Sequence, residues 1–404
     1  MMKYNPLSGI KVIELATYVA APGAARILSE LGAKVIKVES FDGDLWRASG
    51  KAQLKTDDDE NPIFDVYNAG KKSICINIKN PEGKELLMRL LRDADVFITN
   101  TRARSLKKLG LDPETLTSQF SRLIYAIVDG FGDKGKDANT PGFDNNAFWG
   151  RSGFARDIPI KTEDYYPMPV ISGVGDSVTG GFLVAGIATA LYQREVTGRG
   201  DVVRLSLYGT AIWILSSMLL RSDPKYGQVY PKNSVTGDPL TYNYECADGE
   251  WINISVRSYD KDAPVYYRIL GIQDEVNKIG DLNRSNYQEY QAQLITLIRN
   301  AFLHKSSEEW LELLLKEDLA VGRLPHMKDV LADSQAWDNG FVEEMINRNG
   351  HKSILACQPI HIGTCKKMAA VPAPMAGENT EEIMIELGYS KEKISELKVS
   401  GAVC

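Results

Sequence analysis

Apolar residues in the first 130 positions form short runs that alternate with longer stretches of helical spacing. Lys11–Leu15 (KVIEL) and Lys34–Val38 (KVIKV) predict strands, and Ala20–Leu31 predicts the helix between them. The same pattern predicts strands at Ser73–Ile78, Val96–Thr99 and Leu123–Val128, and helices at Pro81–Asp93 and from Arg102 onward. Alternating strands and helices are typical of a parallel sheet covered on both faces, so we expect an α/β fold here.

The pattern changes near the middle of the chain. The pattern predicts an apolar helix at Val178–Arg194, a strand at Asp201–Leu205 and a second apolar helix to about Arg221. The next segment, Asp223–Asp238, is rich in Pro, Gly, Asn and Lys, which indicates a linker. A hairpin at Tyr242–Val256 follows, with amphipathic helices near Tyr259–Leu270, Tyr287–His304 and Ser307–Lys316 and terminal helices at Thr380–Leu387 and Lys391–Lys398. We therefore expect a large domain at 1–222, a smaller α+β domain at 223–325, and a return to the large domain at 326–404.

Composition and charge narrow the function classes. The chain has 404 residues, 44% of them hydrophobic and 25% charged, and a net charge of −6. No clustered basic tract points to nucleic acid. The apolar stretches near Val178–Tyr192 and Leu205–Leu220 are shorter than a bilayer needs, and the start lacks the apolar core of a signal peptide. The five scattered cysteines form no CxxC pair. We expect a cytoplasmic protein with no membrane or nucleic-acid partner.

Several common catalytic motifs are missing from the sequence. The first strand–helix–strand unit suggests a dinucleotide site with Glu39 as the ribose acid, but the turn Thr17–Gly23 lacks GxGxxG, which disfavours a nicotinamide enzyme. No phosphate-binding GxxxxGK[ST] and no GxSxG elbow occur. The four histidines, His304, His326, His351 and His361, show no HExxH spacing, so neither a metal site nor a Ser-His-Asp hydrolase is expected.

One short segment, Val170–Gly181 (VISGVGDSVTGG), places Asp176 between small residues at the predicted start of the long apolar helix. Gly173 and Gly175 would let a substrate approach the backbone closely, and a helix N-terminus offers free N–H groups with partial positive charge. Asp176 is then either a nucleophile or a plain helix N-cap. The residues alone favour the cap, because aspartate is a preferred capping residue.

A longer set of motifs resembles the class III CoA-transferases, the family that includes formyl-CoA:oxalate, carnitine and bile-acid CoA-transferases. The likeness runs over nearly the whole chain, through LSGIKVIELATYVAAPGAARILSELGAKVIKVE, NAGKKSICINIKNPEGKELL, KLGLDPETL, PGFD, GVGD and TGRGDVVRLSLYGTA. DDENPIF, ITNTRARSLKKLGLD and PGFDNNAFWGRSG are similar to the clostridial members that act on (R)-2-hydroxy acids such as phenyllactate and 2-hydroxyisocaproate. The resemblance implies a Rossmann-like large domain built from both chain ends, a small domain between them, and a homodimer of interlocked rings.

The resemblance also implies roles for particular residues. Asp176 would attack an acyl-CoA to give a mixed anhydride and then an enzyme-bound CoA thioester, with N–H groups near Gly173 and Gly175 stabilising the oxyanions. Asp144, in PGFD, matches an acidic residue close to the nucleophile. No tightly bound cofactor is implied, because acyl-CoA and a carboxylic acid are the substrates and energy balance between thioesters removes the need for ATP. The implied CoA-binding residues are Val19, Ala20, Ile76, Asn77, Lys79, Asn100, Thr101, Arg102 and Lys108.

Two departures from the oxalate enzyme put the acid in doubt and argue against oxalate: Val178 replaces a polar residue, and no glycine-rich flap is found. Two others concern contacts with CoA, where Val19 replaces a glutamine of other members and Ser40 replaces an arginine that binds the nucleotide in the oxalate enzyme. Arg102 and Lys108 can equally be a solvated helix face, and Asp144 a turn or cap residue.

We expect a 2-hydroxy or related organic acid in anaerobic metabolism. Carnitine-like or bile-acid substrates and 2-methylacyl-CoA racemisation are the alternatives, although the lack of histidine from Met1 to Asn300 argues against the racemase. A non-catalytic CoA-binding protein is the third reading.

Overall fold

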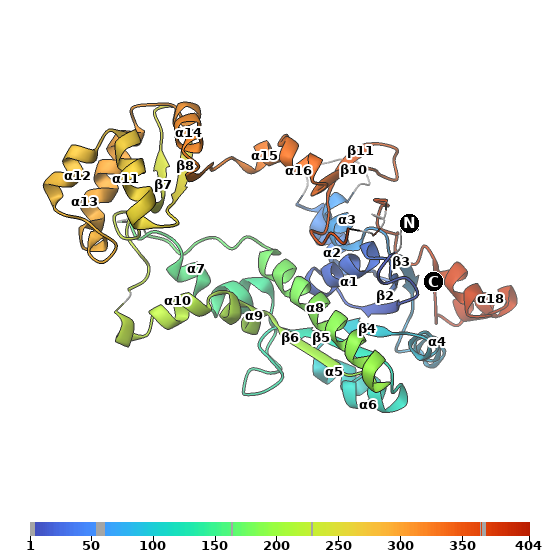
Figure 1. Ribbon diagram of the computed structural model, residues 1–404. Coiled ribbons are helices and arrows are strands. Elements are labelled where there is room, and N and C mark those ends of the chain that lie inside the picture. Colours follow the sequence, from blue (N-terminus) through green and yellow to red (C-terminus); the bar gives the residue numbers. More distant parts are fainter. Residues whose placement is uncertain (1–4, 54–60, 163–164, 228, 364, 366–368) are drawn as a thin grey trace. The chain divides into compact units, whose positions relative to one another are not determined.

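The computed structural model describes residues 5–404 except 54–60, 163–164, 228, 364 and 366–368 (Figure 1). The chain forms two compact units. Unit 1 comprises Met1–Ala155, Pro169–Gly227 and Trp337–Cys404, and unit 2 comprises Arg156–Met168 and Gln228–Ala336. Unit 2 therefore begins and ends some residues later than the 223–325 expected from sequence, and it takes in 156–168, which we expected in the first segment.

Unit 1 is built on a six-stranded parallel sheet with the order β3-β2-β1-β4-β5-β6. In this doubly wound order the chain runs outward from β1 in one direction and then from β4 in the other, which opens a crevice at the carboxyl ends of the central strands. Ligands of open α/β sheets bind in that crevice. The strands are β1 (Lys11–Leu15), β2 (Lys34–Glu39), β3 (Lys72–Cys75), β4 (Val96–Thr99), β5 (Ile124–Asp129) and β6 (Val202–Ser206).

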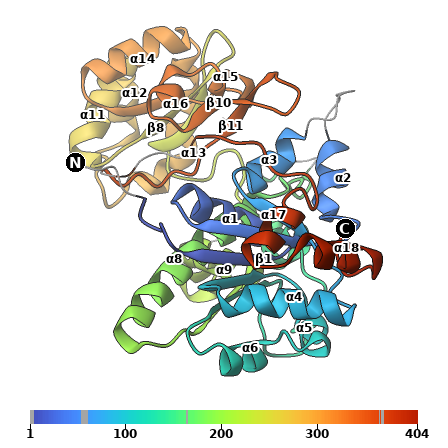
Figure 2. The same cartoon turned by 90° about the vertical axis from the view of Figure 1, so that its right-hand side faces the viewer.

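One face of the sheet is covered by helices from both ends of the chain. Apolar side chains of these helices share a core with sheet residues such as Ile13, Phe97 and Tyr125. The C-terminal helices lie against this face beside helices made some 300 residues earlier (Figure 2). The covering helices are α4 (Pro81–Arg92), α5 (Ala103–Leu109), α6 (Pro113–Gln119), α17 (Thr380–Glu386) and α18 (Lys391–Val399).

The helices α1 (Ala20–Glu30) and α8 (Val174–Thr197) pack against each other on unit 1. Small residues allow the close approach, because a Cβ added to Gly180 would lie 2.7 Å from the carbonyl oxygen of Ala20. At 24 residues α8 is longer than the predicted 178–194, and among the described residues it is the one helix whose length and apolar composition would suit a membrane span. Its Leu183 and Ile187 are fully buried within the unit, as in a core helix.

The rest of unit 1 consists of shorter elements. A hairpin of β10 (Val342–Ile346) and β11 (Lys352–Ala356), which the sequence pattern did not predict, packs against α3. The other short elements are α2 (Leu45–Lys51), α3 (Pro62–Asn68), the π-helix η1 (Asp144–Gly150), α9 (Leu207–Ile214), α10 (Ser216–Arg221) and the 3-10 turn η2 (Pro224–Tyr226), while α7 (Phe154–Asp157) and α16 (Ser334–Asp338) cross the unit boundaries.

Unit 2 has its own core beneath a three-stranded antiparallel sheet. The sheet has the order β7-β8-β9, and its predicted hairpin is β7 and β8. Buried aromatic side chains, among them Tyr244, Tyr266 and Phe302, fill the space between the sheet and the helices. The elements are β7 (Thr241–Glu245), β8 (Trp251–Ser255), β9 (Ala320–Arg323), α11 (Tyr259–Leu270), α12 (Gln273–Ile279), η3 (Tyr287–Tyr290), α13 (Gln291–Phe302), α14 (Ser307–Lys316) and α15 (Met327–Val330).

Candidate active site

The first turn of α8 carries Asp176. The helix begins at Val174, four residues earlier than predicted, with Gly173 as its N-cap in the left-handed region at φ 89°. Asp176 therefore lies inside the first turn, and no side chain caps this helix end. The N-cap alternative for Asp176 is wrong, because the residue is helical and its carboxylate accepts no capping hydrogen bond.

Asp144, the first residue of η1, approaches the same helix end. Its Oδ2 accepts a hydrogen bond of 2.7 Å from the backbone N–H of Gly173. Gly175 makes this approach possible, since a Cβ there would lie 2.3 Å from Oδ1 of Asp144 and 2.3 Å from the ring of Phe148. The Gly173 N–H that we expected to stabilise an oxyanion is thus already bound to a carboxylate. Of the donors expected near Gly173 and Gly175, the Gly173 N–H is therefore not free to stabilise an oxyanion.

The carboxylates of Asp176 and Asp144 are both harder to ionise than an ordinary aspartate. Burial raises the pKa of Asp176 to about 7, and the charge of Asp144 adds to that effect. Burial also raises the pKa of Asp144, although the backbone N–H groups of Gly173, Gly175 and Asp176 oppose the shift. Among the described residues, no hydrogen-bond donor lowers the pKa of Asp176. An ordinary aspartate is fully ionised at neutral pH, whereas Asp176, with a pKa of about 7, is only partly ionised there.

Tyr67, near the end of α3, also reaches the first turn of α8. A Cβ built on Gly173 would lie 3.1 Å from the Tyr67 hydroxyl. Burial raises the pKa of Tyr67, the Ser177 side chain opposes that shift as a hydrogen-bond donor, and the charges of Asp176 and Asp144 add to it. Sequence reasoning missed this residue, because nothing in the α3 pattern shows which side of the helix will meet α8.

The turn between β1 and α1 lies at the switch point of the sheet and is held from several sides. The backbone N–H of Thr17 donates to Oδ1 of Asn100 at 3.1 Å, and Nδ2 of Asn100 donates to the Thr17 carbonyl at 2.6 Å. Tyr18 adopts a left-handed backbone with φ 68°, and its N–H donates to Oδ1 of Asp44 at 3.1 Å. These bonds fix the backbone that leads into Val19 and Ala20, where the resemblance puts the CoA thiol.

A buried charge cluster underlies this turn and was also missed from sequence. Nζ of Lys37 lies 2.7 Å from Glu14 and 2.9 Å from Asp44, and Nζ of Lys71 lies 2.6 Å from Glu14, with all four side chains fully buried. Lys37 also donates to the carbonyl of Ala16 at 2.9 Å. Burial lowers the pKa of Lys71 to about 8, with the Glu14 charge opposing it. Two cations and two anions balance, which lets the cluster brace the turn.

The residues expected to bind CoA follow the carboxyl ends of β1, β3 and β4, so they lie along one edge of the sheet. Their side chains are not equally available. Val19, Ala20 and Ile76 are buried, so they offer backbone groups. Asn77 bonds the Gly401 carbonyl through Nδ2 at 3.2 Å. Lys79, Arg102 and Lys108 are exposed, which is compatible both with binding the CoA phosphates and with a solvated surface. Asn100 and Thr101 are partly buried.

Glu39 is occupied by other side chains of unit 1. Its carboxylate accepts hydrogen bonds from Arg47 at 2.9 and 2.7 Å, from the Ser73 hydroxyl at 2.6 Å and from the Asp44 N–H at 2.9 Å. The Glu39 carboxylate therefore links β2 to β3 and α2 through these hydrogen bonds. A ribose-binding role for Glu39 has no support in these contacts.

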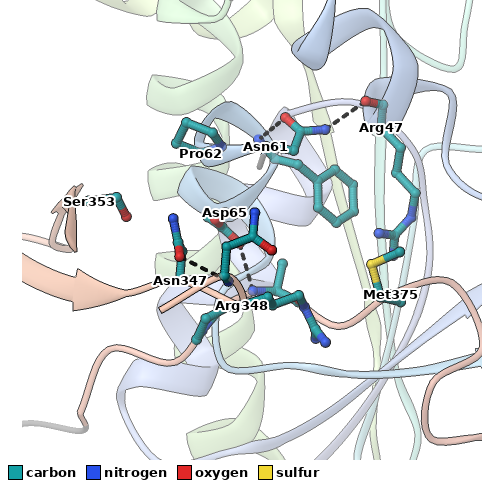
Figure 3. A pocket seen from close by; sticks show the side chains of 12 residues that line it. Arg47, Asn61, Pro62, Asp65, Asn347, Arg348, Ser353 and Met375 are labelled. Atoms are coloured by element: carbon teal, nitrogen blue, oxygen red, sulfur yellow. Dashed lines mark hydrogen bonds between the residues drawn. The ribbon is translucent and has the colours of Figure 1, made fainter. Parts of the chain in front are cut away.

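A separate small pocket lies between α3, the β10–β11 turn and residues 372–375 (Figure 3). Its volume of about 60 Å³ corresponds to roughly four water molecules. Nδ2 of Asn347 and Oγ of Ser353 are buried there without a hydrogen-bond partner among the described residues, which suits ordered water. None of the residues expected to bind CoA or to react lines this pocket.

Comparisons with known proteins converge on one family. The model of CoA-transferase family III matches residues 7–380. The chain is 33% identical to (R)-2-hydroxy-4-methylpentanoate CoA-transferase of Clostridioides difficile, over 98% of this chain and 99% of that protein. It is 35% identical to cinnamoyl-CoA:phenyllactate CoA-transferase of Clostridium sporogenes, over 98% and 96% of the two chains.

Solved structures agree with the fold. A CAIB/BAIF family protein from Brucella suis superposes with a TM-score of 0.78 at 28% identity, covering 95% of this chain and 99% of that one. A protein from Mycobacterium tuberculosis gives a TM-score of 0.79 at 26% identity, covering 94% and 99%. The mixed α/β fold with its parallel sheet is therefore shared with these proteins.

Proposed function

The chain belongs to CoA-transferase family III, and on that premise we propose that it moves CoA from an acyl-CoA to a free 2-hydroxy or related carboxylic acid through covalent intermediates on Asp176. The family match and the full-length likeness to named CoA-transferases make the chain an enzyme of this class. The choice of acid and the chemical route are our proposal.

The route needs only the Asp176 carboxylate as nucleophile. One carboxylate oxygen adds to the thioester carbonyl carbon, the carbonyl electrons move onto oxygen, and collapse expels CoA thiolate to leave a mixed anhydride. The thiolate then adds to the Asp176 carbonyl carbon and expels the donor acid as its carboxylate, which leaves a CoA thioester on Asp176. The acceptor acid runs the same steps in reverse, so the enzyme returns unchanged and no external energy source is consumed.

The environment of Asp176 carries this proposal. Its carboxylate lies at a helix N-terminus and has a pKa of about 7 because of burial and the nearby Asp144. A desolvated carboxylate of raised basicity is a better nucleophile than one held by hydrogen bonds, and perturbed acids of this kind gather at reaction centres.

The acid class rests on the relatives. The two clostridial proteins are named for 2-hydroxy acids, 2-hydroxy-4-methylpentanoate and phenyllactate. The oxalate enzymes matched by the chain are less similar, at 26% identity.

The exposed Lys79, Arg102 and Lys108 beyond β3 and β4 offer cations to the CoA phosphates, and Asn100 joins the β1 turn to this edge.

A CoA-exchange assay tests the activity and the acid together. Purified enzyme is given several acyl-CoA donors and a panel of acids that includes 2-hydroxy-4-methylpentanoate, phenyllactate, carnitine, a bile acid and oxalate. We expect transfer to be fastest for the 2-hydroxy acids. Asp176→Ala should lose transfer, and acyl-CoA with hydroxylamine should inactivate only the enzyme that retains Asp176.

The control is Asp93→Ala, which removes an exposed aspartate at the end of α4, by the opposite edge of the sheet. It should keep full activity. Transfer by Asp176→Ala at the wild-type rate would refute the nucleophile. Exchange of the α-proton of a 2-methylacyl-CoA with deuterated water, without transfer to any acid, would favour the racemase.

We also propose a cytoplasmic homodimer, as the family resemblance implies, and interlocked rings as its arrangement. Large apolar side chains are exposed on α8 to α10, with Tyr192 at 74%, Val196 at 71%, Trp213 at 68% and Leu220 at 66% exposure. Apolar patches of this kind mark interaction surfaces. Light scattering after size exclusion should give twice the mass of 44.8 kDa, and a monomer at micromolar concentration would contradict this proposal.

A further inference from the structure

Acyl transfer at Asp176 generates an oxyanion that needs hydrogen-bond donors. One backbone donor at the first turn of α8 is already bound to another group. The Gly173 N–H is bound to Asp144 at 2.7 Å, and the N–H groups of Gly175 and Asp176 act on the same carboxylate. Oxyanions of acyl transfer are stabilised by positioned donors close to the nucleophile. The Gly173 N–H is therefore committed to Asp144, and a side-chain donor at this helix end would add to the stabilisation of the oxyanion.

Tyr67 is the side chain placed to supply it. Residues 173, 176 and 177 share one side of the first turn of α8, since positions three and four apart on a helix are neighbours. The Tyr67 hydroxyl lies next to Gly173 and hydrogen-bonds Ser177, so it is beside the Asp176 side chain. Its ring is fixed from the other side, where Cδ1 would lie 3.5 Å from a Cβ built on Gly23 of α1.

We propose that the Tyr67 hydroxyl donates a hydrogen bond to the oxyanion formed when Asp176 attacks a CoA thioester. The inference rests on the proposed function and assigns the site a donor that belongs to α3. Substrate binding then brings the carbonyl oxygen of the thioester to the same first turn, within reach of the Tyr67 hydroxyl.

The hydroxyl keeps its proton throughout. As the carboxylate oxygen bonds to the carbonyl carbon, the carbonyl π-electrons move onto oxygen and the Tyr67 O–H points to that charge. Collapse restores the C=O and breaks the C–S bond, so the thiolate leaves with the electron pair and no proton is transferred. Burial and the charges of Asp176 and Asp144 hold the pKa of Tyr67 above its ordinary value, which keeps the phenol a donor and not an acid that would ionise.

Tyr67→Phe is the test, because it removes the hydroxyl and keeps the ring between α1 and α8. Loss of one oxyanion donor should lower kcat for CoA transfer about 100-fold. The KM for the acyl-CoA should stay within about threefold, because the interaction forms in the transition state. A kcat for Tyr67→Phe within threefold of wild type would overturn the proposal.

Two further variants separate donation from a structural role. Tyr125→Phe removes another buried hydroxyl of unit 1, which donates to the Leu111 carbonyl at 2.8 Å, and should lower the unfolding temperature without changing kcat. Ser177→Ala removes the resting partner of Tyr67 and should keep kcat within about threefold. An equal loss in Ser177→Ala and Tyr67→Phe would show that Tyr67 only holds the turn of α8, and would also overturn the proposal.

Failure of this inference can be told from failure of the proposed function. If wild-type enzyme transfers CoA and Asp176→Ala does not, while Tyr67→Phe matches wild type, only the donor assignment is lost. If wild-type enzyme transfers CoA to none of the acids, the proposed function fails, and the donor assignment fails with it.

Discussion

A single carboxylate sets the expected dependence on pH. Asp176 must be ionised to attack, yet burial and Asp144 raise its pKa to about 7. We therefore expect kcat/KM to rise with pH through about 7 and to level off above it, since kcat/KM reports the free enzyme. Initial rates from pH 5.5 to 8.5 measure this. A flat profile across pH 7 would contradict the environment described for Asp176.

Asp144→Asn provides the matched change. The amide oxygen can still accept from the Gly173 N–H, but the charge that adds to the raised pKa of Asp176 is gone. The inflection in kcat/KM should move to lower pH by about one unit, the shift expected from removing one nearby like charge. An unmoved inflection would show that burial alone fixes the pKa of Asp176.

The same carboxylate affects stability. The folded pKa is raised above the ordinary value of 3.8, so ionisation disfavours the folded state, and the cost grows between about pH 4 and pH 7 and is complete above pH 7. Asp176→Asn should therefore be more stable than wild type by about 4 kcal/mol at pH 8 and by only about 1 kcal/mol at pH 4.5. Urea unfolding at the two pH values measures the difference. Equal stability at pH 8 would contradict it.

Sequence reasoning could find single residues only where a motif carries them. Asp176 and Asp144 stand in short segments, GVGD and PGFD, whose glycines mark close backbone approach. Tyr67 carries no such mark, because its role depends on its side chain reaching from α3 to Gly23 of α1 and Gly173 of α8. The partners of Glu14 and Lys37 are likewise distant in sequence, so alternation alone could not show that their charges balance inside the unit.

Two adjacent glycines of α8 should respond in opposite ways. A Cβ on Gly180 would lie 2.7 Å from the Ala20 carbonyl oxygen and 3.3 Å from the Ala24 nitrogen, whereas a Cβ on Gly181 would meet nothing within 4 Å. Gly180→Ala should therefore destabilise unit 1 by about 1–3 kcal/mol through forced separation of α1 and α8. Gly181→Ala should increase the free energy of unfolding by as much as about 1 kcal/mol, because alanine is the better helix former.

Thermal unfolding of both variants measures these shifts. A stable Gly180→Ala would show that α1 and α8 do not approach as closely as described. Gly181→Ala serves as the control, because it makes the same chemical change one residue away.

The strands were the most predictable elements, and helix ends the least. Buried parallel strands require continuous apolar runs, so β1, β2 and β4 could be placed within a residue of their ends. The start of α8 was misplaced by four residues, because Gly173 and Gly175 suggested a turn and the helix nevertheless begins at Val174. The hairpin β10–β11 was missed, since its strands alternate weakly and each contains a single buried residue.

The sheet is completed by the far end of the chain. Ile76 forms an antiparallel bridge with Val403, and the N–H of Asn77 donates to the Ala402 carbonyl at 2.9 Å. Val403 is 1% exposed and Val399, four residues earlier, is 90% exposed. Val403→Ala should therefore cost about 2 kcal/mol in the free energy of unfolding, and Val399→Ala less than about 0.5 kcal/mol. Equal effects of the two in thermal unfolding would contradict this packing.

A change of composition near 223 predicted the start of the second unit, and the return to the large domain was predicted at 326. Residues 324–336 contain no clear break in composition, and the chain rejoins unit 1 only at Trp337. The inclusion of 156–168 in unit 2 depends on a bridge between Lys161 and Asn233, a tertiary contact without a local signal.

The bond between the Cys75 N–H and the Thr380 hydroxyl joins groups 305 residues apart. At about 5–20 residues per second, a ribosome needs roughly 15–60 s to make the stretch between them. Throughout that interval the apolar side of β3 that α17 and α18 will cover stays exposed. The nascent sheet is therefore prone to aggregation until those two helices are made. Chaperone demand during translation should accordingly fall sharply once those helices emerge.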